Sequence, residues 1–313
     1  MTQTFAGFVR ALARICLLAA ATLVQCPAAT AQPADLIVSN ARIATLDPAS
    51  RTASALAVRD GRLIAVGTDA SVQALAGPAT RRIDAGSRTV IPGLIDSHIH
   101  AIRAALSYST EVSWIGAATI AEATSRLREA AARSRPGAWL IVAGGWTELQ
   151  FAERRRPTLA EVLSAVPDNP TYVQMFYSHV LMTPRAYADA GLSADNLPAG
   201  MAQERDASGA PTGWLTGGIV GISALFDKLP KPTYEDNLRG TRQFLSELNR
   251  LGITGVIDPG GFSLGPPQYA ALLQLWREKA LTVRVAYSLF AQNPGAELAE
   301  FRNLTQLLPM GFG

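Results

Sequence analysis

Two of the three histidines in this 313-residue chain, His98 and His100, stand within three positions of each other. They follow an apolar stretch, residues 89–95, that predicts a buried strand and includes Pro92-Gly93. Residues two apart on a strand point to the same side, so both imidazoles can meet at one point beyond the strand's carboxyl end. Two neutral imidazoles so placed are typical ligands of Zn²⁺ or a related divalent ion. The pattern therefore predicts a metal site formed by His98 and His100.

A His-x-His pair alone is a weak signal, because on a polar strand face such a pair is often incidental. Here the scarcity of histidine and the apolar strand in front of the pair favour ligands. Asp96 lies two residues before His98 and on the same side of the strand. Asp96 would either hydrogen-bond to the metal ligands and orient them, or hold the backbone turn.

The chain around the pair predicts alternating strands and helices. Two capping boxes, Thr119 with Glu122 and Thr158 with Glu161, each predict the start of a helix. Apolar segments predict further strands at residues 139–142, 172–176, 253–257 and 281–289. Strand–helix–strand units of this kind predict an α/β fold with a parallel sheet or barrel. In such a barrel, active sites lie at the carboxyl ends of the strands.

Two other regions have a different character. Residues 32–89 predict a small β-rich module, in which Asp60-Gly61 forms a hairpin turn. This module is too short to be stable by itself. Residues 184–230 are rich in Pro, Gly and Asp and predict an elaborated loop inserted in the region 90–313.

Residues 1–31 have the organisation of a cleavable signal peptide. Arg10 and Arg14 precede an apolar run over residues 15–24, and Ala29-Thr30-Ala31 forms the cleavage pattern. A buried N-terminal helix is the alternative. The run is shorter than the about 20 residues needed to cross a bilayer, and Cys26 lies in a poor lipoprotein box. We therefore expect a soluble secreted or periplasmic protein without a transmembrane segment.

Removal of this leader changes the composition. Both cysteines, Cys16 and Cys26, lie within it, so the mature chain would have no thiol chemistry and no disulfide. The leader holds two arginines and no acidic residue, so the net charge of the mature chain would be +1 instead of +3. This near-neutral balance gives no indication of a nucleic-acid partner.

Residues 92–100 resemble the Pro-Gly-x-x-Asp-x-His-x-His signature of the amidohydrolase superfamily. Further motifs are similar to the amidohydrolase-3 branch, which includes N-substituted formamide deformylase-like proteins. They are Gly144-Gly145-Trp146, Pro157-Thr158-Leu159, Ser178-His179 before Arg185-Ala186, the run over residues 209–215, and the run over residues 252–256. This resemblance covers about residues 35–291. It implies a (β/α)₈ (TIM-like) barrel with a small N-terminal β-sandwich.

The resemblance also implies a reaction: hydrolysis of non-peptide C–N bonds, such as linear amides, by metal-activated water. The cofactor would be a divalent metal, Zn²⁺ by expectation, in one or two ions. By resemblance His179 would contact the substrate near the metal, whereas the residues alone leave open a buried histidine bonded to a carbonyl. The family's remaining ligands and its general base have no match here, and Gly217 stands where many relatives place a glutamate. No catalytic residue is therefore assigned, and the barrel is expected to be incomplete, as in the N-terminal part of an amidohydrolase.

Two functions stay open at this point. The first is a metal-dependent hydrolase with a small-molecule amide substrate, whose site would be completed by a missing C-terminal half or an oligomer partner. The second is a catalytically inert exported fragment that acts at most as a binding or interaction module. Zinc stoichiometry together with amide turnover would distinguish them.

Three further features have ordinary structural interpretations. Asp258, followed by Pro-Gly-Gly, is typical of a turn. The alternative is a residue that supports the metal ligands without binding the metal itself. The run 154–156 of three arginines predicts a solvated surface, with steering of an anionic substrate as the alternative. Trp146 is expected in the core, with a pocket wall as the alternative.

Overall fold

The computed structural model describes residues 32–48, 52–261 and 264–305. The predicted signal peptide and both cysteines lie outside the described residues. By its contacts the chain separates after Pro92 into two units, each of which is described by itself. None of the helices in the described ranges combines the length and apolar character that crossing a bilayer requires.

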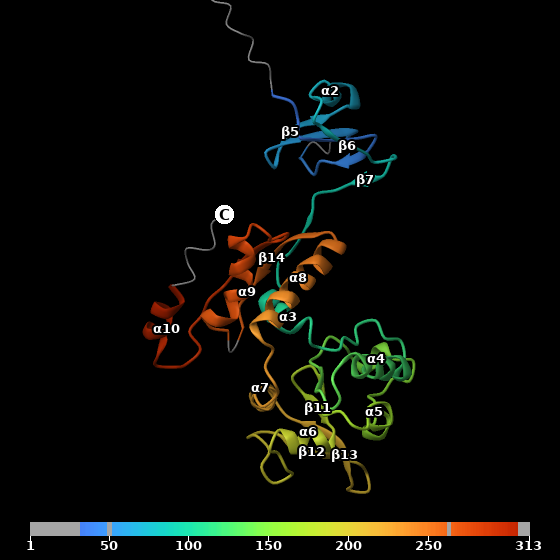
Figure 1. Cartoon of the computed structure of the whole chain (residues 1–313), viewed down its shortest axis with the longest axis vertical. Helices are drawn as coiled ribbons and strands as arrows, with labels where there is room; N and C mark the ends of the chain where they lie inside the picture. Colours follow the sequence, from blue (N-terminus) through green and yellow to red (C-terminus); the bar gives the residue numbers. More distant parts are fainter. Residues whose placement is uncertain (1–31, 49–51, 262–263, 306–313) are drawn as a thin grey trace, which may run out of the picture. The chain divides into compact units, whose positions relative to one another are not determined.

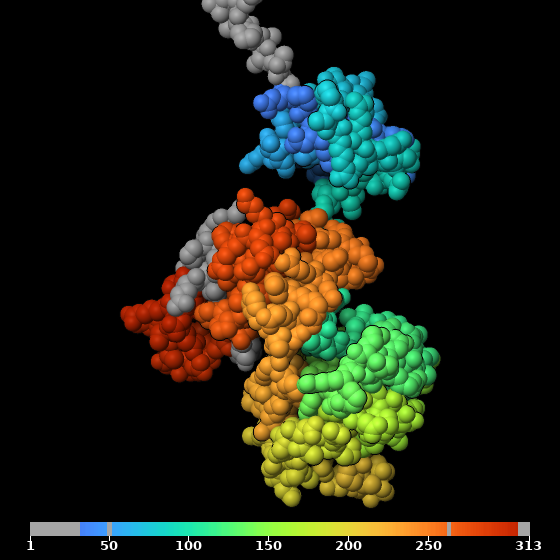
Figure 2. Space-filling view, in the orientation of Figure 1, coloured from blue at the N-terminus to red at the C-terminus, as the bar shows by residue number. Residues whose placement is uncertain are grey.

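The described residues of the first unit form two small sheets and a short helix, drawn as one blue-to-cyan body in Figure 2. One sheet has the order β5-β4-β1-β6 and the other the order β3-β2-β7. The elements are β1 (Leu36–Ser39), β2 (Arg42–Ala44), β3 (Thr52–Ala53), β4 (Ala55–Arg59), β5 (Arg62–Gly67), α2 (Asp69–Gln73), β6 (Arg81–Asp84) and β7 (Thr89–Val90). The turn at Asp60-Gly61 joins β4 to β5, and both of its residues have a positive φ.

The second unit contains a three-stranded parallel sheet in the order β15-β14-β8. Its strands and helices are β8 (Leu94–Asp96), β14 (Ile253–Asp258), β15 (Arg284–Tyr287), α3 (Ala101–Ser107), α8 (Tyr234–Arg250), α9 (Pro266–Arg277) and α10 (Glu297–Leu304). Figure 1 shows α3, α8 and α9 gathered around β14. Leu245 and Leu248 of α8 pack with Val256 of β14, so one face of the sheet is covered. Other strand residues are exposed: Ile95 of β8 is 63% exposed and Ile257 of β14 is 43% exposed.

The predicted buried strand over residues 89–95 is wrong in two respects. The structure divides it into β7, which pairs with β2, and β8, which pairs with β14. Pro92 lies between them, and because proline has no backbone N–H it cannot continue a ladder of hydrogen bonds. Leu94 is 50% exposed, so β8 is not buried.

A second sheet of this unit has five strands in the order β12-β13-β11-β10-β9. They are β9 (Leu140–Val142), β10 (Thr171–Met175), β11 (His179–Met182), β12 (Ala202–Arg205) and β13 (Pro211–Thr216). Only the pair β9 and β10 is parallel; the others are antiparallel. The region predicted as a loop, residues 184–230, therefore contributes β12 and β13, and also α6 (Pro184–Asp189) and α7 (Ile219–Phe226).

Helices α4 (Ile120–Arg133) and α5 (Leu159–Ala165) begin at the two predicted capping residues. Thr158 and Glu161 make both bonds of a capping box, whereas Glu122 accepts from Ala118 N instead of returning to Thr119. A short 3₁₀ helix, η1 (Glu148–Gln150), precedes α5. Aromatic rings fill the core between these helices and the sheet: Trp114 and Trp146 lie 5.0 Å apart by ring centroids. Trp146 is a core residue, as expected.

The α/β class is confirmed. A closed barrel is not formed by the residues that the structure describes, because β8 and β9 both end their sheets and each pairs with a single strand. The barrel therefore stays a property expected from the family.

Leu127 of α4 is fully buried in this aromatic core. We expect Leu127→Ala to lower the free energy of unfolding by about 2–5 kcal/mol, because the lost methyl groups leave a cavity. Leu149→Ala, at a side chain that is 66% exposed, should change it by less than about 0.5 kcal/mol. Urea unfolding followed by circular dichroism measures both; equal effects would contradict this packing.

Candidate functional site

The two predicted metal ligands lie in the loop that follows β8, not on the strand itself. Strand β8 ends at Asp96, whose Oδ1 accepts a hydrogen bond of 2.9 Å from the backbone N–H of His98. Asp96 therefore holds the turn, which was one of its two expected roles. His100 is the residue from which α3 begins. Both histidines are exposed.

The imidazole rings of His98 and His100 nevertheless stay close. Their centroids lie 5.6 Å apart and their planes are perpendicular. Two imidazoles on one tetrahedral ion, with Zn–N distances of 2.0–2.1 Å, place their centroids about 5 Å apart. The spacing of this pair therefore fits two corners of a tetrahedral site.

A backbone carbonyl fixes the orientation of His100. Its Nδ1 lies 2.7 Å from the carbonyl oxygen of Gly260. Because a carbonyl oxygen only accepts, Nδ1 carries the hydrogen and donates it, which leaves the lone pair on Nε2. Metal-binding histidines usually make this second hydrogen bond, since it fixes both the tautomer and the ring orientation.

The Gly260 carbonyl is in turn held by Asp258, the last residue of β14. This carboxylate is fully buried and accepts from Gly260 N at 2.7 Å and from Ile102 N at 2.8 Å. The first bond closes the turn that the sequence predicts, and the second ties β14 to the first turn of α3. Gly260 has φ +84°, and a Cβ there would lie 2.7 Å from the carbonyl oxygen of Ser288. The position therefore requires glycine.

The donors at this site are of the right kind but few in number. Within the described ranges, no group of three or more His, Cys, Asp and Glu side chains could hold a metal ion. A catalytic zinc site usually has three protein ligands and a water. His98 and His100 thus fit two positions of such a site, and the described residues do not complete it.

His179, the predicted substrate-binding residue, is the first residue of β11. It pairs with Met175 at the carboxyl end of β10, the end at which active sites of parallel sheets lie. Its Nδ1 lies 2.8 Å from the hydroxyl oxygen of Ser178, and its Nε2 lies 4.0 Å from Oε2 of Glu204. It is half-buried and makes no hydrogen bond to a carbonyl of the described residues, which also do not join it to the His98 pair in one metal site.

An ion pair that sequence analysis missed lies beside His179. Arg156 Nη2 donates to Glu204 Oε2 at 2.8 Å, and the guanidinium lies 4.8 Å from the ring centroid of Trp214. The Arg156 side chain is only 24% exposed, so the prediction of a solvated arginine run is wrong at this position. No local pattern marks Glu204, because the β12–β13 hairpin brings it beside Arg156.

These neighbours set the charge of His179. Burial lowers its pKa below the usual 6.5, and the positive charge of Arg156 lowers it further. The carboxylates of Glu204 and Glu148 act in the opposite direction but are outweighed. His179 is therefore a neutral imidazole at pH 7, able to donate and accept hydrogen bonds.

Comparison with known proteins identifies the family to which the chain belongs. Residues 81–312 match the Amidohydrolase family, which covers more than half of the chain. The chain belongs to this family, and the resemblance found in its motifs is confirmed.

The matches to individual relatives include a larger share of this chain than of the relatives' own length. It is 30% identical over 238 residues to Protein LONG AFTER FAR-RED 3 of Arabidopsis thaliana, covering 74% of this chain and 39% of that protein. It is also 30% identical over 232 residues to N-substituted formamide deformylase of Arthrobacter pascens, covering 72% and 43%. An uncharacterized metal-dependent hydrolase from Pyrococcus furiosus superposes with a TM-score of 0.54 at 20% identity, covering 81% and 50%. The chain thus spans about half the length of these proteins or less. The superposition on the Pyrococcus furiosus structure supports the fold of the chain.

The buried Asp258 carboxylate should be needed for both stability and the orientation of His100. Asp258→Ala leaves two backbone N–H groups without their acceptor, and we expect it to lower the free energy of unfolding by about 2–4 kcal/mol. The same substitution should allow His100 to populate both neutral tautomers, which ¹⁵N NMR of the imidazoles detects. Asp227→Ala removes an exposed carboxylate paired with Lys231 and should change neither; a tautomer unchanged in Asp258→Ala would contradict the role given to Gly260.

The pKa of His179 should respond in opposite directions to its two charged neighbours. We expect Arg156→Gln to raise it and Glu204→Gln to lower it, while Arg155→Gln, whose arginine pairs with Glu161, leaves it unchanged. Because the folded pKa lies below 6.5, the unfolded chain takes up this proton first, so His179 makes folding less favourable as pH falls below about 6.5. ¹H NMR titration of the three histidines measures the pKa; shifts of equal sign would contradict the assigned contacts.

Proposed function

We propose that this chain takes part in metal-dependent hydrolysis of a C–N bond in a small-molecule amide, with His98 and His100 as two of the metal ligands. The observation that carries the proposal is the histidine pair, with ring centroids 5.6 Å apart and His100 Nδ1 bonded to the Gly260 carbonyl. Membership of the Amidohydrolase family supports it at the level of the reaction class.

The residues of the chain have separate tasks in this proposal. A divalent ion, Zn²⁺ by preference, would supply a bound water with a pKa near 7 and polarise the substrate carbonyl. Gly260 keeps the Nε2 lone pair of His100 free, and Asp258 holds Gly260 and the start of α3 in place. Neutral His179 would hydrogen-bond the amide. No described residue is assigned as the general base.

The remaining ligands would come from a polypeptide segment that pairs with β8. Two features of the described residues favour this. The donor set stops at two histidines, and β8 is an edge strand whose Ile95 is 63% exposed. A further strand there would cover the apolar side chain and bring additional donors to the same end of the sheet.

We also propose a secreted or periplasmic location, because residues 1–31 have the pattern of a cleavable signal peptide.

The two-donor set also supports a second candidate, a binding module without catalysis. Such a chain would keep the fold of the family and recognise a ligand or partner without turning it over. Metal affinity and turnover of an N-substituted formamide, the substrate named for the Arthrobacter pascens relative, separate the two candidates.

Zinc binding to the full chain tests the ligand assignment. We expect His98→Ala and His100→Ala to weaken zinc binding at least about 10-fold in isothermal titration calorimetry, because loss of a residue that only hydrogen-bonds to a ligand already costs about that much. The third histidine provides the matched control, because His179→Ala should leave the zinc affinity unchanged while it reduces amide turnover. Equal losses in all three variants, or a wild-type chain that binds no zinc, would reject His98 and His100 as ligands.

A further inference from the structure

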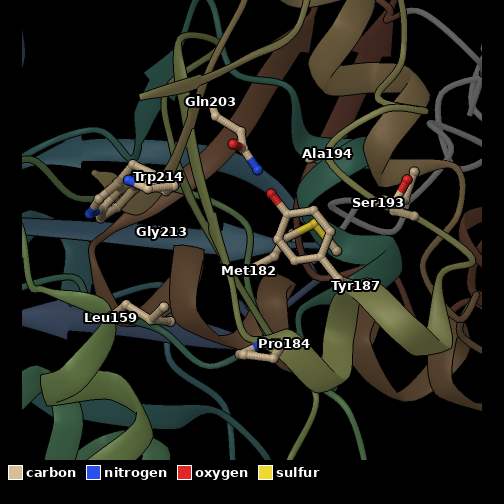
Figure 3. Close-up of a pocket in the computed structure, with 11 residues that line it drawn as sticks. Leu159, Met182, Pro184, Tyr187, Ser193, Ala194, Gln203, Gly213 and Trp214 are labelled. Carbon is tan, nitrogen blue, oxygen red and sulfur yellow. The ribbon is translucent and has the colours of Figure 1, made fainter. Parts of the chain in front are cut away.

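A cavity of about 320 Å³ opens beside the five-stranded sheet, at the end of β11 opposite to His179. Met182, the last residue of β11, lies in its wall, and Tyr187 of α6 and Gln203 of β12 contribute the side chains that reach into it (Figure 3). Leu159 of α5 and Trp214 of β13 close another side. Three strands of this sheet and two helices therefore build the cavity.

The cavity contains two polar groups without partners in the described part of the chain. Neither the Tyr187 hydroxyl nor the Gln203 amide makes a hydrogen bond to another described residue. Figure 3 shows these two groups pointing toward one another. Polar groups that protein atoms leave unpaired are satisfied by water or by a ligand.

Its walls are uncharged. None of the eleven residues that line it is Asp, Glu, Lys, Arg or His. Met182, Leu192 and Trp214 are buried and give it an apolar surface. Moving a charged group into such a place without a partner is unfavourable, so the lining selects against carboxylates and amines.

The protonation state of the tyrosine is also fixed. Burial raises the pKa of Tyr187 above its usual value of 10. The hydroxyl therefore keeps its proton at neutral pH and can donate a hydrogen bond as well as accept one. Gln203 likewise offers both a donor and an acceptor, so the two side chains together match a ligand group with both.

We propose that this cavity binds a neutral small molecule with an apolar body and one uncharged polar group that donates and accepts hydrogen bonds, such as an amide or an alcohol. The apolar body lies against Met182, Leu192 and Trp214, and the polar group meets Tyr187 and Gln203. A volume of 320 Å³ is at the small end of the range for ligand sites, so a single-ring compound fits. The proposal does not depend on the metal site.

Titration of the full chain with acetanilide, a phenyl ring bearing a neutral amide, tests this proposal. We expect a Kd below about 1 mM by ligand-observed NMR, with benzoate and benzylamine at least 10-fold weaker because neither charge finds a partner. Tyr187→Phe removes one hydroxyl and should weaken acetanilide binding about 3- to 10-fold. Equal binding of benzoate, or no binding of acetanilide, would overturn the proposal.

Two tryptophan substitutions locate the bound molecule. Ala194 is an exposed residue of the cavity wall, so Ala194→Trp should fill the space and abolish binding. Ala188→Trp adds the same ring at an exposed position of α6 that does not line the cavity, and it should bind acetanilide as the wild type does. If Ala194→Trp does not fold, Tyr187→Phe carries the test.

His98→Ala and His179→Ala should also bind acetanilide normally, because both residues lie outside the cavity wall. Loss of binding in either of these variants would place acetanilide at the candidate hydrolase site and overturn the proposal. Failure of zinc binding with retained acetanilide binding would reject the proposed function alone.

Discussion

One buried carboxylate links the two parts of the candidate metal site. Asp258 ends β14 and binds two backbone N–H groups, one in its own turn and one in α3. Because α3 begins at His100 and the turn presents the Gly260 carbonyl to the same histidine, both the position and the tautomer of His100 follow from this contact. A fully buried charge is stable only with such compensating bonds, so the site and the packing of α3 on the parallel sheet are not independent.

The two sheets of the second unit differ in how well they are enclosed. The five-stranded sheet has all five positions of β10 buried and an aromatic core at its helices. The three-stranded sheet is covered by α3, α8 and α9 on one side, while Ile95 and Ile257 face solvent. The proposed ligands His98 and His100 thus lie next to the less enclosed sheet, after the end of β8. This contrast, together with a donor set of two, is the physical basis for placing further ligands on a segment that pairs with β8.

Sequence analysis predicted what local patterns determine. Capping residues Thr119 and Thr158 mark the starts of helices because they bond within three residues, and the turn at Asp60-Gly61 needs only its own backbone. The strand predicted over residues 89–95 does not match β8, since the limits of β8 depend on pairing with β14, in which Val256 lies opposite Asp96, 160 positions earlier in the chain. Glu204 has no local signal, and the turn predicted at Gly260 does not indicate its bond to His100: each residue acts through a contact with a distant element, Arg156 or His100. The identity of His98 and His100 as candidates came from residue type and spacing, while their hydrogen bonds required the structure.

Anomalous diffraction from crystals of the zinc-loaded chain would show whether His98 and His100 bind the ion, because it locates the ion without reference to activity. We expect one strong peak between the two rings, about 2.0–2.1 Å from Nε2 of His100 and from one nitrogen of His98. A peak at His179, or at the surface with neither ring in contact, would contradict the metal site described here.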